Sequence, residues 1–276
     1  MYRLKSIKLY FFSILKLFFL SFRNIYFKTN FYNKKLITFI PDRIFYNPST
    51  HLSASLTTIT SDFYKITNTT PKLLWETPIK KKHEFENLHN FLWLNKLDRK
   101  NNKIITKDII VSWINTFFNY DPNTWKMEIT AKRIIALLSN TDITLENSDK
   151  IYKEKFFLSL IKQSNFLLKN LNSLFYEPTK IICCAAIILS GIIFKENDSN
   201  YKTGIKELEK IIKNYFDETG FPKSRNPEEV FICIKYLILI REWFKEAQKP
   251  IPDFLNEIIH KCGNCYTILS CSNKQF

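Results

Sequence analysis

If residues 181–194 form a helix, that helix is apolar on almost every side. Such a helix has no polar face to turn toward water, so other helices must enclose it. The stretch is also too short to cross a bilayer, which takes about 20 apolar residues. It therefore predicts a central helix inside a helical domain.

Helical periodicity recurs from about residue 84 to near the end of the chain. Between residues 105 and 117, apolar side chains return at the i, i+4, i+5 and i+8 positions of one helix face. Asn226-Pro227-Glu228-Glu229 predicts a helix start, because it combines an N-cap residue, a proline at the first helical position and acids near the positive end of the helix dipole. Further helices are expected over residues 127–138, 148–171, 205–215 and 226–248, with a last one from near residue 253.

Successive helices with short connections predict an all-α fold of antiparallel helical hairpins. The sequence has no repeat of fixed length, which counts against a simple solenoid. One enclosed helix among one-sided neighbours suits two concentric layers, as in an incomplete (α/α) toroid. Periodicity leaves an irregular bundle open as the alternative.

The first 84 residues read differently. Prolines and β-branched clusters such as residues 56–60 predict irregular chain with short strands at most over residues 31–84. Residues 1–27 mix aromatic and basic side chains, and Lys16 divides the only apolar run, so we expect no membrane span. We also expect no signal peptide, hence a cytoplasmic protein. An amphipathic helix docked on the domain is the favoured structure, and a helix lying on an anionic membrane surface is the alternative.

The predicted organisation is thus a basic, irregular N-terminal extension over residues 1–84, a helical domain over residues 85–261 and a ragged tail over residues 262–276. Lys and Arg outnumber Asp and Glu by 41 to 26, giving a formal charge of +15 that attracts polyanions without choosing among them. The cysteines that lie inside apolar helical runs are expected to be buried thiols. The Cys262-x-x-Cys265 pair lacks a second pair of ligands, and four scattered glycines provide no phosphate loop, so we expect neither a metal nor a cofactor.

Three segments resemble the heparinase II/III-like family of polysaccharide lyases. Leu88-His89-Asn90-Phe91-Leu92-Trp93-Leu94 resembles the opening of the family's helical domain. Trp125 followed by Arg133-Ile134-Ile135 and Ser139-Asn140 resembles a second motif, and Gly220 through Ser224-Arg225-Asn226-Pro227 resembles a loop before a long helix. The resemblance covers roughly residues 85–260. It implies an α/α toroid, normally followed by a β-sandwich, that cleaves acidic polysaccharides by β-elimination, and it makes a periplasmic location the alternative.

Three residues are catalytic candidates. Asn140 matches the family's helix-end asparagine and would neutralise the uronate carboxylate, and Arg225 would bind that carboxylate through a bidentate contact. Tyr236 matches no family motif, but it lies on the helix after the loop and would substitute for the family's Tyr-His pair in proton transfer if it faces the cleft. The alternatives are a helix C-cap for Asn140, an ion pair with neighbouring acids for Arg225 and core packing for Tyr236. The lyase hypothesis requires a ring whose open mouth brings Asn140 and the Arg225 loop to the same side.

Three further residues are candidates for substrate binding. His89 and Arg133 would line the cleft, and Asn226 would contact substrate in addition to capping its helix. The alternatives are a structural hydrogen bond for His89 and a pairing of Arg133 with Glu128.

Two departures from the family weaken the case for catalysis. Phe221-Pro222-Lys223 stands where the family's loop has a histidine, and Glu229-Val230 stands where many active lyases have a Tyr-His pair. The alternative function is therefore a non-catalytic or truncated helical protein that binds a polyanion, with an acidic polysaccharide as the expected partner, an anionic membrane surface as another, and no specific nucleic acid. A helical scaffold for a partner chain is a third possibility.

Overall fold

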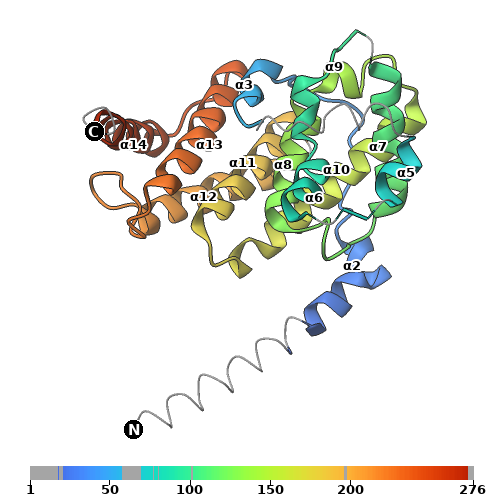
Figure 1. Cartoon of the computed structure of the whole chain (residues 1–276), viewed down its shortest axis with the longest axis horizontal. Helices are drawn as coiled ribbons and strands as arrows, with labels where there is room; N and C mark the ends of the chain where they lie inside the picture. The colour runs from blue at the N-terminus through green and yellow to red at the C-terminus, as the bar shows by residue number, and fades with distance from the viewer. Residues whose placement is uncertain are drawn as a thin grey trace.

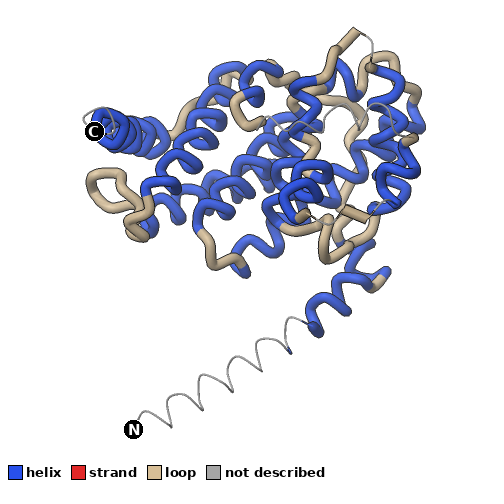
Figure 2. The backbone as a smooth tube through the Cα atoms, viewed as in Figure 1, coloured by secondary structure: helices blue, strands red, loops and turns tan. Residues whose placement is uncertain are grey.

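A computed structural model describes residue 18 and residues 21–57, 70–76, 78–79, 81–100, 102–195 and 198–272. Within these ranges the chain is helix and loop, with no strand (Figure 2). The predicted all-α class is confirmed. None of the helices in these ranges combines the length and apolar character needed to cross a bilayer.

The helices of the domain have boundaries close to those predicted, and Met127–Leu138 matches its prediction at both ends. Asn226 caps the helix after it through its side chain, as expected. The elements are α2 Asn30–Lys35, α3 Thr50–Ala54, α5 Pro71–Glu76, α6 Lys82–His89, the 3₁₀ helix η1 Leu92–Lys96, α7 Lys103–Phe117, α8 Met127–Leu138, α9 Thr141–Thr144, α10 Lys150–Asn170, the 3₁₀ helix η2 Leu171–Ser173, α11 Glu177–Ile193, α12 Asp198–Tyr215, α13 Pro227–Glu246 and α14 Asp253–Ser272.

Helix α11 is the central element, as its sequence requires. Its side chains are buried from Ile181 to Ile193 without interruption, and it contacts α8, α10, α12 and α13 (Figure 1). The approach to α12 is closest at Gly191, where a Cβ atom would lie 2.6 to 2.8 Å from the main chain and Cβ of Tyr201. The all-round apolar sequence is therefore satisfied by neighbouring helices on every side.

Successive helices from α8 onward run in alternating directions. Asn170 at the end of α10 and Thr179 in the first turn of α11 line the same cavity as Glu128 at the start of α8. Tyr215 at the end of α12 donates a hydrogen bond to Glu229 in the first turn of α13. Helices α8, α11 and α13 therefore begin at one end of the domain, where α10 and α12 finish.

The prediction of irregular chain over residues 31–84 is wrong for much of the described part, which contains α2, α3, α5 and the start of α6. These short helices are held by distant side chains rather than by their own propensity. Glu246 on α13 accepts from the Ser49 amide at 3.1 Å, and Asn165 on α10 donates to the Leu36 carbonyl at 2.8 Å. The strand expected near residues 56–60 falls largely outside the described residues.

Residues 21–28 form a helix that leads into α2 and extends from the domain (Figure 1, blue). One side packs on the domain: Phe27 is buried against the rings of Tyr120 and Phe166, and Asn24 accepts a hydrogen bond from the Tyr120 hydroxyl at 2.9 Å. The predicted docked helix therefore has a domain-facing side in this part, and most of residues 1–20 lie outside the described part.

Helix α14 continues through residues 262–272, where we expected a ragged tail. The cause is a contact that local sequence does not reveal. The Cys262 and Cys265 thiols pack on the loop before α13, with their sulfur atoms 3.4 and 3.3 Å from the carbonyl oxygens of Gly220 and Thr219. Gly220 has φ +86°, and a Cβ there would lie 2.4 Å from that of Lys261, so only glycine permits this close approach.

Candidate functional site

The starts of α8, α11 and α13 gather at one end of the domain. The Thr179 hydroxyl on α11 lies 3.3 Å from a carboxylate oxygen of Glu128 on α8, and the Tyr176 side chain lies close enough to Glu229 on α13 for the carboxylate to raise its pKa. We call this end the helix-start face and define it by Lys126, Glu128, Tyr176, Thr179 and Glu229. Helix starts present unpaired N–H groups and a partial positive charge, so the face favours anions.

A cavity of about 500 Å³ opens beside the start of α8. We call it the α8 pocket. Its walls come from α8, α6, the end of α10 and the helix of residues 21–28. Three cationic side chains line it against two carboxylates, and these charged residues are Arg23, Lys126, Lys132, Glu86 and Glu128. Residues from two of the three family-like segments, Asn90 and Trp125, meet here.

Helix α8 has an open N-terminus at this pocket. Lys126 occupies the N-cap position and makes no side-chain cap hydrogen bond. Met127, Glu128 and Ile129, which form the first turn of α8, line the pocket. A serine, threonine, asparagine or aspartate at the N-cap position would have satisfied one of the N–H groups of that turn. An uncapped start facing a cavity is suited to an anionic ligand.

Asn90 supplies a second, independent donor at the same pocket. Its side chain is only 6% exposed, and its Oδ1 accepts from the Leu92 amide at 2.9 Å. Its Nδ2 makes no hydrogen bond within the described part of the chain and reaches the cavity rather than being enclosed by protein. The amide nitrogen is therefore a donor at the cavity wall that a ligand oxygen can accept from.

The lysines of the α8 pocket are held by acids that a ligand carboxylate would displace. Lys132 lies 2.6 Å from Glu128, and Lys126 lies 3.7 Å from Glu86. Both pairs are partly exposed, and such pairs contribute little to stability. The lysines are therefore available to a ligand at low cost.

A second group of polar side chains surrounds Glu229 on the same face. Glu229 is 6% exposed and accepts hydrogen bonds from the Tyr215 and Ser224 hydroxyls. The pKa values of Tyr176 and Tyr215 lie above the ordinary value for tyrosine. Burial is the larger cause, and interaction with the Glu229 carboxylate is the next. Both phenols therefore keep their protons at neutral pH and act as hydrogen-bond donors. No sequence pattern predicts this group, because Tyr215 and Glu229 approach only through the turn between α12 and α13.

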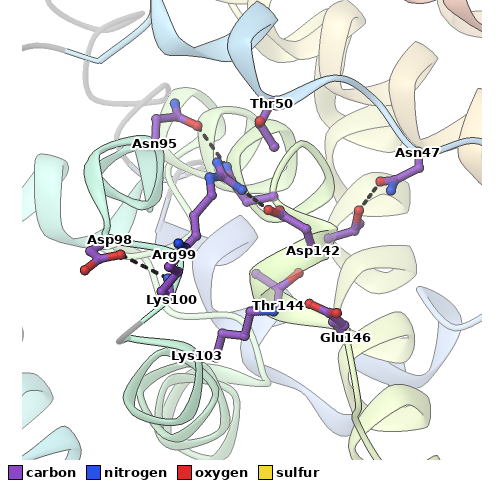
Figure 3. A network of polar contacts seen from close by, with 12 residues as sticks. Asn47, Thr50, Asn95, Asp98, Arg99, Lys100, Lys103, Asp142, Thr144 and Glu146 are labelled. Carbon is purple, nitrogen blue, oxygen red and sulfur yellow. Dashed lines mark hydrogen bonds and ion pairs between the residues drawn. The ribbon is translucent and has the colours of Figure 1, made fainter.

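Asn140 lies at the opposite end of α8 from the pocket. The 12 residues of α8 separate the two ends by about 18 Å. Its side chain is fully buried: Nδ2 donates to the Ala136 carbonyl and to Asn95, both at 2.8 Å, and Oδ1 accepts from Arg99 at 2.8 Å. Figure 3 shows the surrounding network, in which Arg99 also pairs with Asp142. The C-cap residue of α8 is Ser139 rather than Asn140, but the Asn140 amide still satisfies a carbonyl of the last turn of α8, and both of its N–H hydrogens are used within the protein.

Arg225 and Asn226 lie in the turn before α13, so the structure does not bring Asn140 and the Arg225 loop together (Figure 1). Arg225 has φ +61° and donates from Nη1 to Asp217 at 2.7 Å, and its side chain is 68% exposed. The Asp217 carboxylate accepts hydrogen bonds from the Thr219 hydroxyl, the Phe221 amide and Arg225. These bonds, above all the one from Thr219, lower the pKa of Asp217 to about 2. Asn226 accepts from the Glu228 amide at 3.0 Å. The ion-pair and capping alternatives for these two residues are both observed.

Tyr236, Arg133 and His89 are buried. Tyr236 is 4% exposed. Burial is the main cause that raises its pKa, and the negative charge of nearby Glu128 raises it further. The core-packing alternative therefore describes Tyr236. The Arg133 guanidinium donates to Gln163, Thr130 and the carbonyls of His89 and Thr124, so the expected pairing with Glu128 is wrong. Glu128 pairs with Lys132 instead, because Arg133 points to the other side of α8.

The buried imidazole of His89 predicts a pH-dependent stability. Its Nδ1 accepts from the Trp113 indole at 3.1 Å, and burial together with the Arg133 charge lowers its pKa to about 3. The unfolded chain binds this proton below about pH 6.5, whereas the folded chain does not. The free energy of unfolding should therefore fall as pH decreases from 6.5 to 4.5, by up to about 1.4 kcal/mol per pH unit.

Urea unfolding at several pH values measures that slope. The matched variants are His89→Asn and His260→Asn, because His260 is exposed. The slope should shrink in the first variant and persist in the second, and an unchanged slope in His89→Asn would contradict the assignment.

The described residues contain no cluster of His, Cys, Asp or Glu with the geometry of a metal site. Cys183, Cys184, Cys233, Cys262 and Cys265 are buried free thiols, as expected for the first three. Comparisons with protein-family models, curated proteins and solved structures return no match for this chain.

Proposed function

We propose that this protein binds an acidic, uronate-containing polysaccharide at the helix-start face, with one carboxylate of the sugar chain held in the α8 pocket. The carboxylate accepts hydrogen bonds from the first turn of α8 and from Asn90 Nδ2, and it pairs with Lys126. The single observation that carries this proposal is the amide donor of Asn90 at the wall of a cavity that also meets the start of α8, where no side chain caps the helix.

The rest of the face supports a sugar chain rather than a small anion. The pocket volume of about 500 Å³ falls within the range of small-ligand sites. Thr179 at the pocket wall and Tyr176 beyond it place hydroxyl groups between Glu128 and Glu229. Alternating donors and carboxylates of this kind suit the hydroxyl groups of sugars. The chain's formal charge of +15 favours the approach of a polyanion.

The arrangement favours binding over cleavage. β-Elimination needs a base for the proton beside the carboxylate and a donor that stabilises the developing charge. The phenols of Tyr176, Tyr215 and Tyr236 all have raised pKa values and stay protonated, so none is poised as the base. Asn140, the expected neutralising group, lies at the far end of α8. The proposed function is therefore a lyase-like domain that retains polysaccharide recognition.

The resemblance to the heparinase II/III-like family adds a structural element to this proposal. It implies that the helical hairpins curl into part of an (α/α) toroid. The enclosed position of α11 among α8, α10, α12 and α13 supports two layers of helices.

Calorimetric titration with alginate, heparan and chondroitin oligosaccharides tests the proposal. We expect saturable binding that weakens as salt concentration rises. Asn90→Ala and Lys126→Ala should each weaken binding about tenfold, which corresponds to one lost charge-assisted or buried hydrogen bond. Lys155→Ala on exposed α10 surface is the matched control and should bind as the unaltered chain does.

The same samples, monitored by ultraviolet absorbance for unsaturated uronates, separate binding from cleavage. Formation of such product would establish a lyase and overturn the proposal of binding without turnover. Equal weakening by Lys155→Ala and Lys126→Ala would show that charge alone is responsible, and no binding of any of the three polysaccharide classes would remove the proposed function.

A further inference from the structure

The helix of residues 21–28 has a second side that the α8 pocket does not use. At helical spacing, positions 18, 22, 25 and 26 share one side, opposite to position 27. We call this side the outer aromatic face and define it by Phe18, Phe22, Ile25 and Tyr26. Their exposed fractions are 57%, 56%, 64% and 42%. The rings of Phe18 and Phe22 lie 4.5 Å apart, so the apolar surface is continuous between them.

Exposure on this scale is unusual for large apolar side chains that neighbour one another. The domain does not cover this side, because the opposite side of the helix already packs on Tyr120 and Phe166 through Phe27. The helix also projects from the body of the domain (Figure 1). The outer aromatic face is therefore accessible to a large flat partner.

The charge around this face identifies the partner. Eight Lys and Arg residues precede the first acidic residue of the sequence, Asp42. Of these, Lys28, Lys34 and Lys35 are exposed on the described residues next to the face. Aromatic side chains are suited to the boundary between lipid headgroups and acyl chains, and neighbouring lysines without acids among them attract anionic headgroups.

We propose that the outer aromatic face docks on the surface of an anionic phospholipid membrane, with Phe18, Phe22 and Ile25 inserted at the headgroup level and the lysines against lipid phosphates. This interaction is separate from saccharide binding, because the α8 pocket uses Arg23, Asn24 and Phe27 on the other side of the helix.

Co-sedimentation of the full chain with vesicles tests this proposal. The vesicles contain phosphatidylcholine alone, or phosphatidylcholine with about one third phosphatidylglycerol. We expect binding to the anionic vesicles, little to the neutral ones, and at least about tenfold weaker binding for the double variant Phe22→Ser/Ile25→Ser. The matched control is Ile104→Ser/Ile151→Ser, which removes two side chains that are 80% and 68% exposed elsewhere. It should bind as tightly as the unaltered chain.

Two outcomes would overturn the proposal. One is equal binding to neutral and anionic vesicles, or no binding to either. The other is anionic binding that Phe22→Ser/Ile25→Ser leaves intact and that short duplex DNA displaces completely, since this would make the N-terminal region a nonspecific polyanion site. Circular dichroism of both double variants confirms that folding is unchanged, as all four substituted side chains are exposed.

Discussion

Replacing Arg133 with methionine is expected to lower the free energy of unfolding by about 3–5 kcal/mol. Arg133 is fully buried in the middle of α8, and within the described residues its guanidinium pairs with no carboxylate. Its guanidinium donates to Gln163 at 2.7 Å, to the carbonyls of His89 and Thr124 at 2.9 and 3.0 Å, and to Thr130 at 3.2 Å. It also lies 4.1 Å from the centre of the Trp113 ring.

The cost arises from the acceptors that remain. Methionine fills a similar volume but donates nothing, so buried carbonyl and amide oxygens from α6, α10 and the loop before α8 lose their partners. Each unsatisfied buried acceptor costs roughly 1–3 kcal/mol. Arg133 is thus a structural link beneath the α8 pocket, and the variant should weaken saccharide binding as well as stability.

Urea unfolding followed by circular dichroism measures this loss. The control is Arg241→Met on α13, whose guanidinium forms a partly exposed ion pair with Glu242, so its loss should cost less than about 1 kcal/mol. Arg133→Lys keeps the charge with fewer donors and should lie between the two. A loss below about 1 kcal/mol for Arg133→Met would contradict the role of Arg133 as the organiser of these acceptors.

Replacing Gly191 with alanine is expected to destabilise the domain by about 2–3 kcal/mol. Alanine ordinarily stabilises a helix relative to glycine, by about 1 kcal/mol. Here the added Cβ would lie 2.6 Å from the Tyr201 Cβ and 2.7 Å from its amide nitrogen. Helices α11 and α12 would have to separate, because the obstructing atoms include main chain, which cannot rotate away.

Gly263 provides a matched control for the same substitution. It lies within α14, and a Cβ there would meet no atom within 4 Å. Gly263→Ala should therefore raise the free energy of unfolding by about 0.5–1 kcal/mol. Thermal and urea unfolding of the two variants should shift in opposite directions. A stabilising effect of Gly191→Ala would show that α11 and α12 are not packed at this distance.

The two proposed interactions occupy opposite sides of one helix. Arg23, Asn24 and Phe27 line the α8 pocket, whereas Phe22 and Ile25 face outward. The expected effects of Lys126→Ala on saccharide binding and of Phe22→Ser/Ile25→Ser on vesicle binding are therefore independent. Measuring each variant in both assays distinguishes two specific sites from one diffuse basic surface.

The positions of most helices, and the identity of the central one, could be predicted from local sequence patterns. The all-round apolar run predicts an enclosed helix, and α11 is that helix, because a helix without a polar side is stable only among other helices. Asn226 and Pro227 likewise predict the start of α13, because capping depends on neighbouring residues alone. These features are local, so they can be read without knowledge of the fold.

Which residues share a site depends on how the helices pack, and local sequence does not reveal that. Asn140 and the Arg225 turn both lie at helix ends, and periodicity does not reveal which ends meet, so the predicted convergence was wrong. The alternating directions of α8 to α13 bring Glu128, Tyr176 and Glu229 together and send Asn140 to the other end. The short helices α2, α3 and α5 and the extension of α14 past Cys262 are also tertiary effects, because distant packing contacts stabilise segments whose own sequence favours them only weakly.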